Sequence, residues 1–330
     1  MNRTHVVVTG ANGFIGQHLC RKLVESGRDV TACIREQANI PDLDCNSAAL
    51  QVCRIPSLGR STALSRILRN ADAVIHLAGR AHVMRETAKD PLRAFRDVNV
   101  RVTENLASLA IESGVKRFIY LSSVKVNGEV TNDNAFCADD PPGYCDPYGQ
   151  SKWEAEERLI ELAAGTMMEW VIVRPPLVYG PDVRGNFLAI MKYLFRRALL
   201  PLGSIHNNRS LVSVYNLNDF LCLSVDHPTT ANNRFLISDS EDISTPDLIR
   251  RIALAMDRSP RLIRCPEVIL LIAGAMLGQK EAVQRLCSSL VLDKQKVHRV
   301  TGWRAPITLD LGLNRTVEWF LNQQRTMKDD

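Results

Sequence analysis

A glycine-rich junction near the N-terminus constrains the fold more than any other feature of the sequence. The run HVVVTG (5–10) is a short β-branched strand, and FIGQHLCRKLVESG (14–27) follows with apolar residues at helical spacing. Gly10, Gly13 and Gly16 therefore lie where a strand turns directly into a helix. Glycines at such a junction let the turn close tightly and let backbone N–H groups approach a negatively charged group. The sequence thus predicts that the chain begins with a dinucleotide-binding α/β unit.

Strand-like and helical runs continue to alternate after this junction. Apolar strands separated by helices are typical of a parallel sheet that is covered on both faces. We predict an α/β fold, a Rossmann doubly wound parallel sheet with a smaller C-terminal substrate lobe. The expected division is a cofactor-binding domain over residues 1–175 and a mainly substrate-binding lobe over 176–330, with a segment of about 211–240 returning to the first. The predicted strands are 29–34, 71–79, 116–123, 169–176 and 234–239, and the predicted helices are 99–114, 245–257 and 266–278.

The overall composition narrows the class of protein. Hydrophobic residues make up 45% and charged residues 23% of the 330 positions, which are ordinary values for a globular chain. The net charge of +5 suits an anionic small molecule, but without a basic cluster it does not indicate a nucleic-acid-binding protein. Nine cysteines are scattered without metal-binding spacing. We therefore expect a reduced, cytoplasmic chain that binds no metal.

One apolar run has two possible interpretations. The segment VILLIAGAMLG (268–278) is the longest apolar run and is too short to cross a bilayer. We predict that it is a core helix, and the alternative is a helix with a face that touches a membrane. The N-terminal MNRTHVVVTG has too short an apolar part for a signal peptide, so we expect no membrane insertion.

The end of the second predicted strand indicates which dinucleotide is bound. A carboxylate at this position would bind both ribose hydroxyls and would repel a 2′-phosphate. Ile34 cannot accept those hydrogen bonds, whereas Arg35 can pair with a 2′-phosphate. We therefore predict a preference for NADP(H). The alternative is that Arg35 is only a solvated surface residue and that Glu36 serves the ribose of NAD(H).

Other segments are expected to lie beside the cofactor. In HLAG (76–79) the small Ala-Gly pair would let the backbone pass close to it. Asn99 opens the next predicted helix, either as a simple polar cap or as a residue that fixes the catalytic loop. Pro175, with its fixed φ, is expected to shape the wall near the nicotinamide. The predicted cofactor contacts are Gly10, Asn12, Gly13, Phe14, Ile15, Gly16, Arg35, Leu77, Ala78, Gly79, Asn99, Tyr148, Lys152 and Pro175.

A Tyr-x-x-x-Lys pair in YGQSK is the strongest candidate for catalysis. Tyr148 and Lys152 are four residues apart and would share one face of a helix. A lysine ammonium stabilises a nearby phenolate, and so does a positively charged nicotinamide ring. Tyr148 is therefore expected to act as a general acid or base near neutral pH. Ser122 and Ser123 end the preceding strand and offer hydroxyl groups to a substrate oxygen.

These motifs together resemble those of the extended short-chain dehydrogenases/reductases, in the branch of nucleotide-sugar 4-epimerases, 4,6-dehydratases and 4-ketoreductases. The resemblance covers nearly the whole chain and puts the catalytic serine at Ser123, beside Tyr148 and Lys152. Asn127 stands where the family usually has tyrosine. Many family dehydratases carry Asp-Glu soon after the serine, and Val124-Lys125 here makes dehydration unexpected. The matching segments are TGANGFIG, HLAG, SSVKVNG, YGQSK, RPPLVYGP and TGWRAPITLDLGLNRTVEWF.

The resemblance also implies a site for a nucleotide diphosphate in the second half of the chain. YGPDVRGNFL (179–188) and NNRSLVSVYNLND (207–219) are similar to family segments that grip this group. They imply that Asn186 and Arg209 approach the diphosphate, with Arg184 a weaker candidate, and arginine forks suit phosphate oxygens. His82 is a candidate for the sugar, or else a structural or exposed histidine. The expected substrate contacts are His82, Ser123, Lys125, Tyr148, Arg184, Asn186 and Arg209.

The predicted cofactor favours a reductase, because family epimerases typically keep NAD bound whereas reductases consume NADPH. The chain resembles bacterial O-antigen enzymes that reduce a UDP-2-acetamido-2,6-dideoxy-4-keto-hexose to UDP-N-acetylquinovosamine or UDP-N-acetylfucosamine in surface polysaccharide biosynthesis. The alternatives are a UDP-N-acetylhexosamine 4-epimerase with tightly bound NAD and a non-catalytic NADP-sensing protein. The resemblance further implies a homodimer formed through helices such as 99–112 and 152–163.

Overall fold

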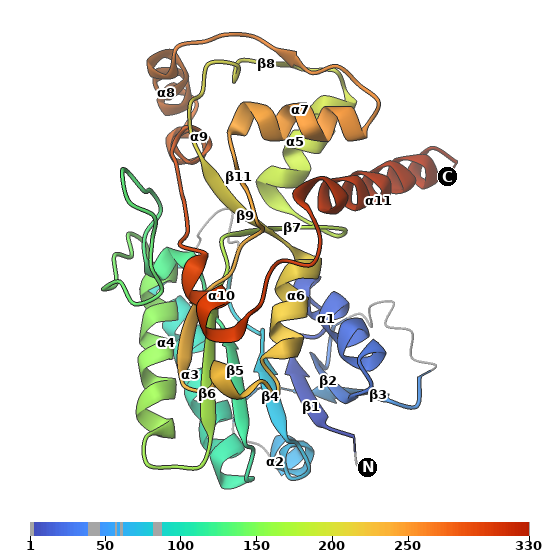
Figure 1. Cartoon of the computed structure of the whole chain (residues 1–330), viewed down its shortest axis with the longest axis vertical. Helices are drawn as coiled ribbons and strands as arrows, with labels where there is room; N and C mark the ends of the chain where they lie inside the picture. The colour runs from blue at the N-terminus through green and yellow to red at the C-terminus, as the bar shows by residue number, and fades with distance from the viewer. Residues whose placement is uncertain (1–2, 39–46, 57, 60–61, 82–87, 330) are drawn as a thin grey trace.

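The computed structural model describes residues 3–38, 47–56, 58–59, 62–81 and 88–329. Its centre is a seven-stranded sheet in the order β10-β6-β5-β4-β1-β2-β3, in which every neighbouring pair is parallel (Figure 1). This arrangement confirms the predicted α/β fold with a doubly wound parallel sheet. The strands are β1 His5–Thr9, β2 Asp29–Arg35, β3 Leu50–Ile55, β4 Ala73–His76, β5 Arg117–Leu121, β6 Glu169–Arg174 and β10 Asn233–Leu236.

Helices cover both faces of this sheet. Val6 and Val8 of β1 pack into one apolar cluster with α1 (Phe14–Glu25) and α6 (Val214–Leu223). Val7 packs into another on the opposite face. Because both faces are buried, the strands are continuously apolar rather than alternating. The second cluster contains residues of α2 Thr62–Leu68, α3 Pro91–Glu112 and α4 Pro147–Ala163.

The C-terminal half builds a second lobe above the carboxyl ends of the strands (Figure 1). A small sheet in the order β11-β9-β7 and a two-stranded pair, β12-β8, support it. Its core contains Tyr179, Phe187, Ile252 and Phe320. The elements are β7 Leu177–Tyr179, α5 Gly185–Phe195, β8 Leu199–Leu200, β9 Arg209–Ser213, β11 Asp242–Ile243, α7 Thr245–Ala255, β12 Arg261–Leu262, α8 Glu267–Met276, α9 Lys280–Cys287 and α11 Leu309–Asp329. Helix α10, Gln295–Thr301, instead packs beside β10 at the large sheet.

The chain crosses between the two lobes more than once. From β9 in the small sheet it enters α6, which packs beside α1, and then β10, which pairs with β6 at the edge of the large sheet. Residues 214–223 and 233–236 therefore belong to the layers of the large sheet, whereas Arg209–Ser213 lies in the small one.

Two elements of the first half differ from the prediction. Helix α3 begins at Pro91 rather than at residue 99, because Asp90 accepts a hydrogen bond from the Arg93 backbone N–H at 3.0 Å and Pro91 fits the first turn. The predicted list also lacked β3, whose residues are mostly half-buried or exposed. An edge strand of this kind has no continuous apolar run to identify it.

The prediction that VILLIAGAMLG is a core helix is wrong. These residues do form a helix, α8. Only Leu270 and Gly274 of α8 are buried, while Val268, Ile272 and Met276 are exposed. An apolar run by itself does not show whether protein covers it on every side. Among the described residues no helix is both long and apolar enough to cross a membrane.

Candidate active site

The candidate site lies at the carboxyl edge of the large sheet, where parallel strands end together. The glycine junction follows β1, and HLAG begins at His76, the last residue of β4. Ser122 and Ser123 follow β5. Pro175 follows β6, and its carbonyl oxygen accepts a hydrogen bond from the Val124 backbone N–H at 3.0 Å. The fold therefore brings four separate sequence motifs to one edge.

The glycine junction is packed too closely for any side chain. Gly10 has a φ of +71°, and a Cβ at this position would lie 2.8 Å from the backbone nitrogen of Ala78. A Cβ at Gly16 would lie 2.4 Å from the carbonyl oxygen of Gly10. The N-cap residue of α1, Gly13, makes no side-chain capping bond, and the first turn carries no acidic residue. The positive end of α1 is therefore suited to the pyrophosphate of a dinucleotide.

Three more predicted cofactor residues lie in this turn. The Asn12 carbonyl accepts a hydrogen bond from the Gln17 side chain at 3.0 Å, and the Ile15 carbonyl accepts one from Asn218 at 3.3 Å. Phe14 makes an edge-to-face contact with His18. The turn is thus fixed by contacts with α1 itself and with α6.

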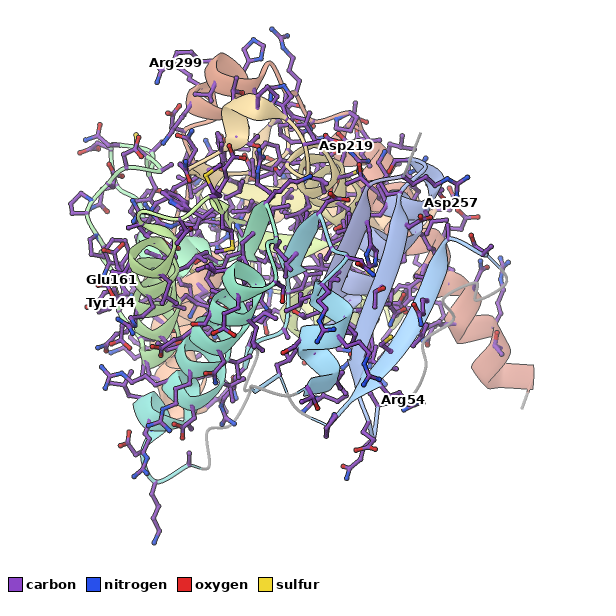
Figure 2. The ribbon with its side chains drawn as sticks, turned by 90° about the horizontal axis from the view of Figure 1, so that it is seen from below. Arg54, Tyr144, Glu161, Asp219, Asp257 and Arg299 are labelled. Atoms are coloured by element: carbon purple, nitrogen blue, oxygen red, sulfur yellow. The ribbon has the colours of Figure 1, made fainter. Side chains whose placement is uncertain are left out.

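The end of β2 separates two adjacent side chains. Ile34 is 1% exposed and belongs to the core, whereas Arg35 is exposed. On the neighbouring strand, Arg54 donates hydrogen bonds to the backbone carbonyls of Glu36 and Ala38 at 2.5 and 2.9 Å. Figure 2 shows Arg54 on the opposite side of the molecule from Tyr144 and Glu161, at the β3 edge. Two arginines therefore lie at the end of the sheet where an adenosine ribose is expected.

Asn99 connects the segment after β4 to helix α4. It lies inside α3 and is 1% exposed, so the interpretation of Asn99 as a helix cap is wrong. Its side-chain oxygen accepts a hydrogen bond from the Arg80 backbone N–H at 2.7 Å, and its nitrogen donates to the Ser151 hydroxyl at 2.9 Å. A Cβ at Gly79 would lie 3.1 Å from that oxygen. Leu77, also predicted here, donates its N–H to the Thr9 carbonyl at 3.2 Å.

The three predicted catalytic residues meet at the start of α4. The Ser123 hydroxyl lies close enough to the Tyr148 phenol to lower the pKa of that phenol. Lys152 is 5% exposed, and its ammonium donates to the Leu121 carbonyl at 2.7 Å and lies 4.3 Å from the centre of the Tyr120 ring. One helix and the end of one strand therefore assemble a hydroxyl, a phenol and an amine. This set can bind an oxygen atom and exchange a proton with it.

Burial shifts the pKa values of Tyr148 and Lys152 in opposite directions. It raises the pKa of Tyr148 to about 12, although the nearby Ser123 hydroxyl lowers it. It lowers the pKa of Lys152 to about 7, although the Glu156 carboxylate raises it. Each shift favours the neutral form, as expected for groups taken out of water. Burial thus opposes the lowered Tyr148 pKa that the sequence predicted from nearby positive charge.

A buried ion pair supports these residues, and the sequence analysis missed it. The Glu156 carboxylate accepts hydrogen bonds from the Ser122 hydroxyl at 2.5 Å and from Arg174 at 2.5 and 2.9 Å. Arg174 also donates to the Asn127 side-chain oxygen at 3.0 Å. The pair joins α4, the ends of β5 and β6, and the loop after Ser123. An arginine inside the apolar run VIVRPP was the available signal, because a buried charge requires a partner.

Lys125, predicted to contact substrate, is bound to two carboxylates. It lies in a short 3₁₀ helix, η1 Val124–Val126, and donates to Glu129 at 2.5 Å and to Asp146. Asp146 caps α4 by accepting from the Gly149 N–H at 2.6 Å. Burial lowers the pKa of Lys125, but the hydrogen bonds to Asp146 and Glu129 outweigh it and raise the pKa overall. In this arrangement Lys125 holds the loop against the first turn of α4.

The predicted diphosphate contacts lie in two places in the second lobe. Arg209, on β9, donates to the carbonyls of Arg285 and Ser288 at 2.7 and 2.8 Å, and both burial and the Arg285 charge lower its pKa. Arg184 and Asn186 are exposed at the start of α5. Arg184 lines a cavity of about 230 Å³ that Phe14 and Gln17 of α1 also line. His82 lies outside the described residues.

The chain matches a known protein family over more than half of its length. The family model described as the NAD dependent epimerase/dehydratase family matches residues 6–238. This range contains the glycine junction, Ser123, Tyr148 and Lys152. The chain belongs to this family. The matched range covers the strands of the large sheet together with α1, α3 and α4.

Individual relatives cover nearly the full length of this family member. A UDP-glucose 4-epimerase from Vibrio cholerae is 39% identical over 96% of this chain and 95% of its own length. An N-acetyl-α-D-glucosaminyl-diphospho-ditrans,octacis-undecaprenol 4-epimerase from Escherichia coli O157:H7 is 26% identical over 96% and 95%. The crystal structure of a UDP-glucuronic acid 4-epimerase from Bacillus cereus, in complex with NAD, superposes with a TM-score of 0.78, 21% identity and coverage of 97% and 99%. At that identity the structural likeness shows the fold.

Proposed function

We propose that this protein uses NADPH to reduce the C4 keto group of a UDP-2-acetamido-2,6-dideoxy-4-keto-hexose, giving UDP-N-acetylquinovosamine or UDP-N-acetylfucosamine. The observation that carries the proposal is the end of β2, where Ile34 is buried and Arg35 is exposed. Neither Ile34 nor Arg35 has a carboxylate that could bind the ribose hydroxyls, and the Arg35 guanidinium suits a 2′-phosphate. A preference for NADPH favours net reduction over a hydride that is returned to the same sugar.

The catalytic residues have defined roles in this reaction. The glycine turn, Arg35 and Lys152 would hold NADPH, which would supply the hydride for the new C4–H bond and leave as NADP⁺. Tyr148 donates its phenolic proton to the oxygen as the carbonyl becomes a hydroxyl, and the proton is then restored from solvent. Ser123, which lies close to the Tyr148 phenol, binds the same oxygen. The burial that raises the pKa of Tyr148 to about 12 keeps the phenol protonated, which suits a proton donor.

The surrounding residues hold this geometry and bind the substrate. Lys152 lies below the site and binds the cofactor ribose. The buried pair Glu156 and Arg174 fixes the ends of β5 and β6 on which Ser123 and Pro175 depend. Asn186 and Arg184, at the start of α5, and Arg209, on β9, bind the diphosphate of the nucleotide sugar.

The direct test is consumption of reduced nicotinamide by the purified protein with this keto-sugar. We expect stoichiometric loss of NADPH absorbance and much slower loss of NADH. Ile34 is 1% exposed, so an aspartate there would be buried, and Arg35→Ala is the cleaner cofactor variant. It should lower kcat/KM for NADPH about tenfold or more and leave NADH use unchanged, because it removes a charge-assisted bond. Arg66→Ala, an exposed arginine on α2, is the matched control.

The second candidate is a UDP-N-acetylhexosamine 4-epimerase with tightly bound NAD. The Vibrio cholerae relative, a UDP-glucose 4-epimerase at 39% identity, supports it. It predicts release of NAD when the protein is denatured, interconversion of two UDP-sugars and no net consumption of NADPH. Unchanged NADPH use in Arg35→Ala would also count against the reductase.

The third candidate, a non-catalytic NADP sensor, requires that Ser123, Tyr148 and Lys152 do no chemistry. Their assembly at one site argues against it.

We further propose that the protein acts in bacterial surface polysaccharide biosynthesis and is located in the cytoplasm. We also propose that it forms a homodimer through α3 and α4. Light scattering of the purified protein tests the dimer.

A further inference from the structure

We propose that α8 docks this protein on the surface of an anionic lipid bilayer. One side of α8 and the residue after it present large apolar side chains to the solvent. These side chains are between 55% and 83% exposed, whereas most large apolar residues of the protein are buried. Contiguous exposed apolar surface of this kind marks an interaction site. The residues are Val268, Ile269, Ile272, Met276 and Leu277.

The opposite side of α8 is firmly seated on the protein. Leu270 packs into a small apolar cluster with Ile205 and Cys287. A Cβ at Gly274 would lie 2.6 Å from the Val283 side chain, so α8 and α9 are in close contact at this point. The exposed face is therefore the outer side of a helix held in place, at the tip of the C-terminal lobe and at the far end of the molecule from α2 (Figure 1).

The charges that flank α8 are mostly positive. Arg261 and Arg264 precede the helix and Lys280 follows it, and all three are exposed. Residues 268–279 carry no charge, and the flanks from 261 to 285 hold four basic residues against the two acidic residues Glu267 and Glu281. An apolar face with basic residues beside it is the pattern of a helix that lies in the bilayer interface. The basic side chains would contact anionic head groups while the apolar ones enter the acyl boundary.

Neither spanning the bilayer nor self-association fits α8 as well. Ten residues of helix are about 15 Å long, half of what a hydrocarbon core of about 30 Å requires. A second copy of the chain packed face to face on α8 would bring both sets of Arg261, Arg264 and Lys280 together, and like charges repel. An anionic surface complements the apolar face and the charges at once.

Within the C-terminal lobe, helices α8 and α9 are connected to the segment that carries Arg209, a predicted diphosphate contact. Asn207 donates hydrogen bonds to the carbonyls of Leu286 and Ser288, both at 3.0 Å, and Arg209 donates to the carbonyls of Arg285 and Ser288. The α8–α9 unit is thus fixed to the loop before β9. If the proposed function holds, docking brings Arg209, a predicted diphosphate contact, close to the membrane surface. The docking itself does not depend on that function.

Vesicle co-sedimentation of the full-length protein tests the proposal. We expect binding to phosphatidylcholine vesicles with about 30% phosphatidylglycerol, and little binding to phosphatidylcholine alone, because basic residues near an anionic surface each contribute to binding. The variant Ile269→Ser/Ile272→Ser/Met276→Ser should lower the vesicle partition coefficient about tenfold or more, since the apolar face is lost. Arg261→Gln/Arg264→Gln should lower it about tenfold on the anionic vesicles only.

Matched controls separate α8 from a general surface effect. Met167→Ser/Leu254→Ser removes two apolar residues that are 94% and 75% exposed elsewhere, and Arg66→Gln/Arg69→Gln removes two exposed arginines near α2. Both should bind vesicles as the unaltered protein does. A tryptophan at position 272 (Ile272→Trp) should show blue-shifted fluorescence with anionic vesicles, independently of sedimentation.

Two results would overturn the proposal. One is that the unaltered protein stays in the supernatant and Ile272→Trp shows no blue shift with anionic vesicles. The other is light scattering in which the α8 apolar variant halves the mass of the particle, which would assign this face to a second copy. NADPH consumption is not part of either readout, so failure of the docking proposal and failure of the proposed reaction are distinguishable.

Discussion

The large parallel sheet and helix α8 are built from similar apolar residues, but those of the sheet are mostly buried and most of those of α8 are exposed. Ile119 on β5 is fully buried, whereas Ile272 on α8 is 56% exposed. The sheet is covered by helices on both faces, and it carries buried charges at its carboxyl edge because they are paired. Helix α8 is covered on one side only and has basic residues at its flanks. The comparison shows that an apolar segment favours burial away from water, while the tertiary arrangement decides which element, if any, buries it.

The largest effect should separate the chemistry of the sheet edge from the docking of α8. We expect Tyr148→Phe to lower kcat by about 10³ or more, because the proton donor is lost, with cofactor binding and vesicle binding unchanged. Steady-state kinetics, fluorescence titration with NADPH and vesicle co-sedimentation measure the three quantities. Near-normal turnover would remove Tyr148 from the mechanism.

The next test breaks the buried charge pair below the site. Glu156→Gln leaves Arg174 without its ionised partner in a fully buried position, and we expect a loss of about 3–5 kcal/mol of unfolding free energy. Denaturant titration measures it. The adjacent Glu157→Gln is the control, because Glu157 pairs with Arg234 at a partly exposed site and should cost at most about 1 kcal/mol. Equal losses in the two variants would show that burial does not distinguish them.

A matched pair of isoleucines tests the comparison directly. Ile119→Ala removes a fully buried side chain and should cost about 2–5 kcal/mol through lost burial and a residual cavity. Ile272→Ala should change the unfolding free energy by less than about 0.5 kcal/mol, since its side chain is mostly in water. If Ile272→Ala were as costly as Ile119→Ala, α8 would be covered in solution.

The last test concerns the pH dependence that a neutral histidine at the end of β4 gives to stability. Burial, with the nearby Lys152 charge, lowers the pKa of His76 to about 3, and its ring is hydrogen-bonded to the hydroxyls of Thr9 and Thr103 at 2.6 and 3.1 Å. The unfolded chain takes up this proton below about pH 6.5 and the folded chain does not until about pH 3.

His76 should therefore remove stability as the pH falls from 6.5 to 3, by at most about 1.4 kcal/mol per pH unit. Thermal unfolding of the unaltered protein and of His76→Gln between pH 7 and pH 4 tests this. The two curves should converge in acid, and a constant difference would contradict the assignment.

Local patterns predicted most of the large sheet and the positions of the motifs. The glycine junction, the serine pair and Tyr148 with Lys152 each follow from short-range rules, and the structure brings Ser123, Tyr148 and Lys152 together. The edge strand β3 escaped prediction because its residues are mostly half-buried or exposed. The placement of Asn99 inside α3 also escaped, since a proline-led first turn starts the helix eight residues earlier.

The sequence by itself determined that this chain forms a parallel α/β sheet with a dinucleotide turn and a tyrosine–lysine pair on one helix face. Periodicity and glycine stereochemistry act within a few residues and need no distant partner. Only the tertiary structure decided that Glu156 pairs with Arg174, that Lys125 is bound by Asp146, and that α8 faces solvent. Each of these depends on which distant segment lies opposite, and burial and pairing of that kind arise only when the layers pack.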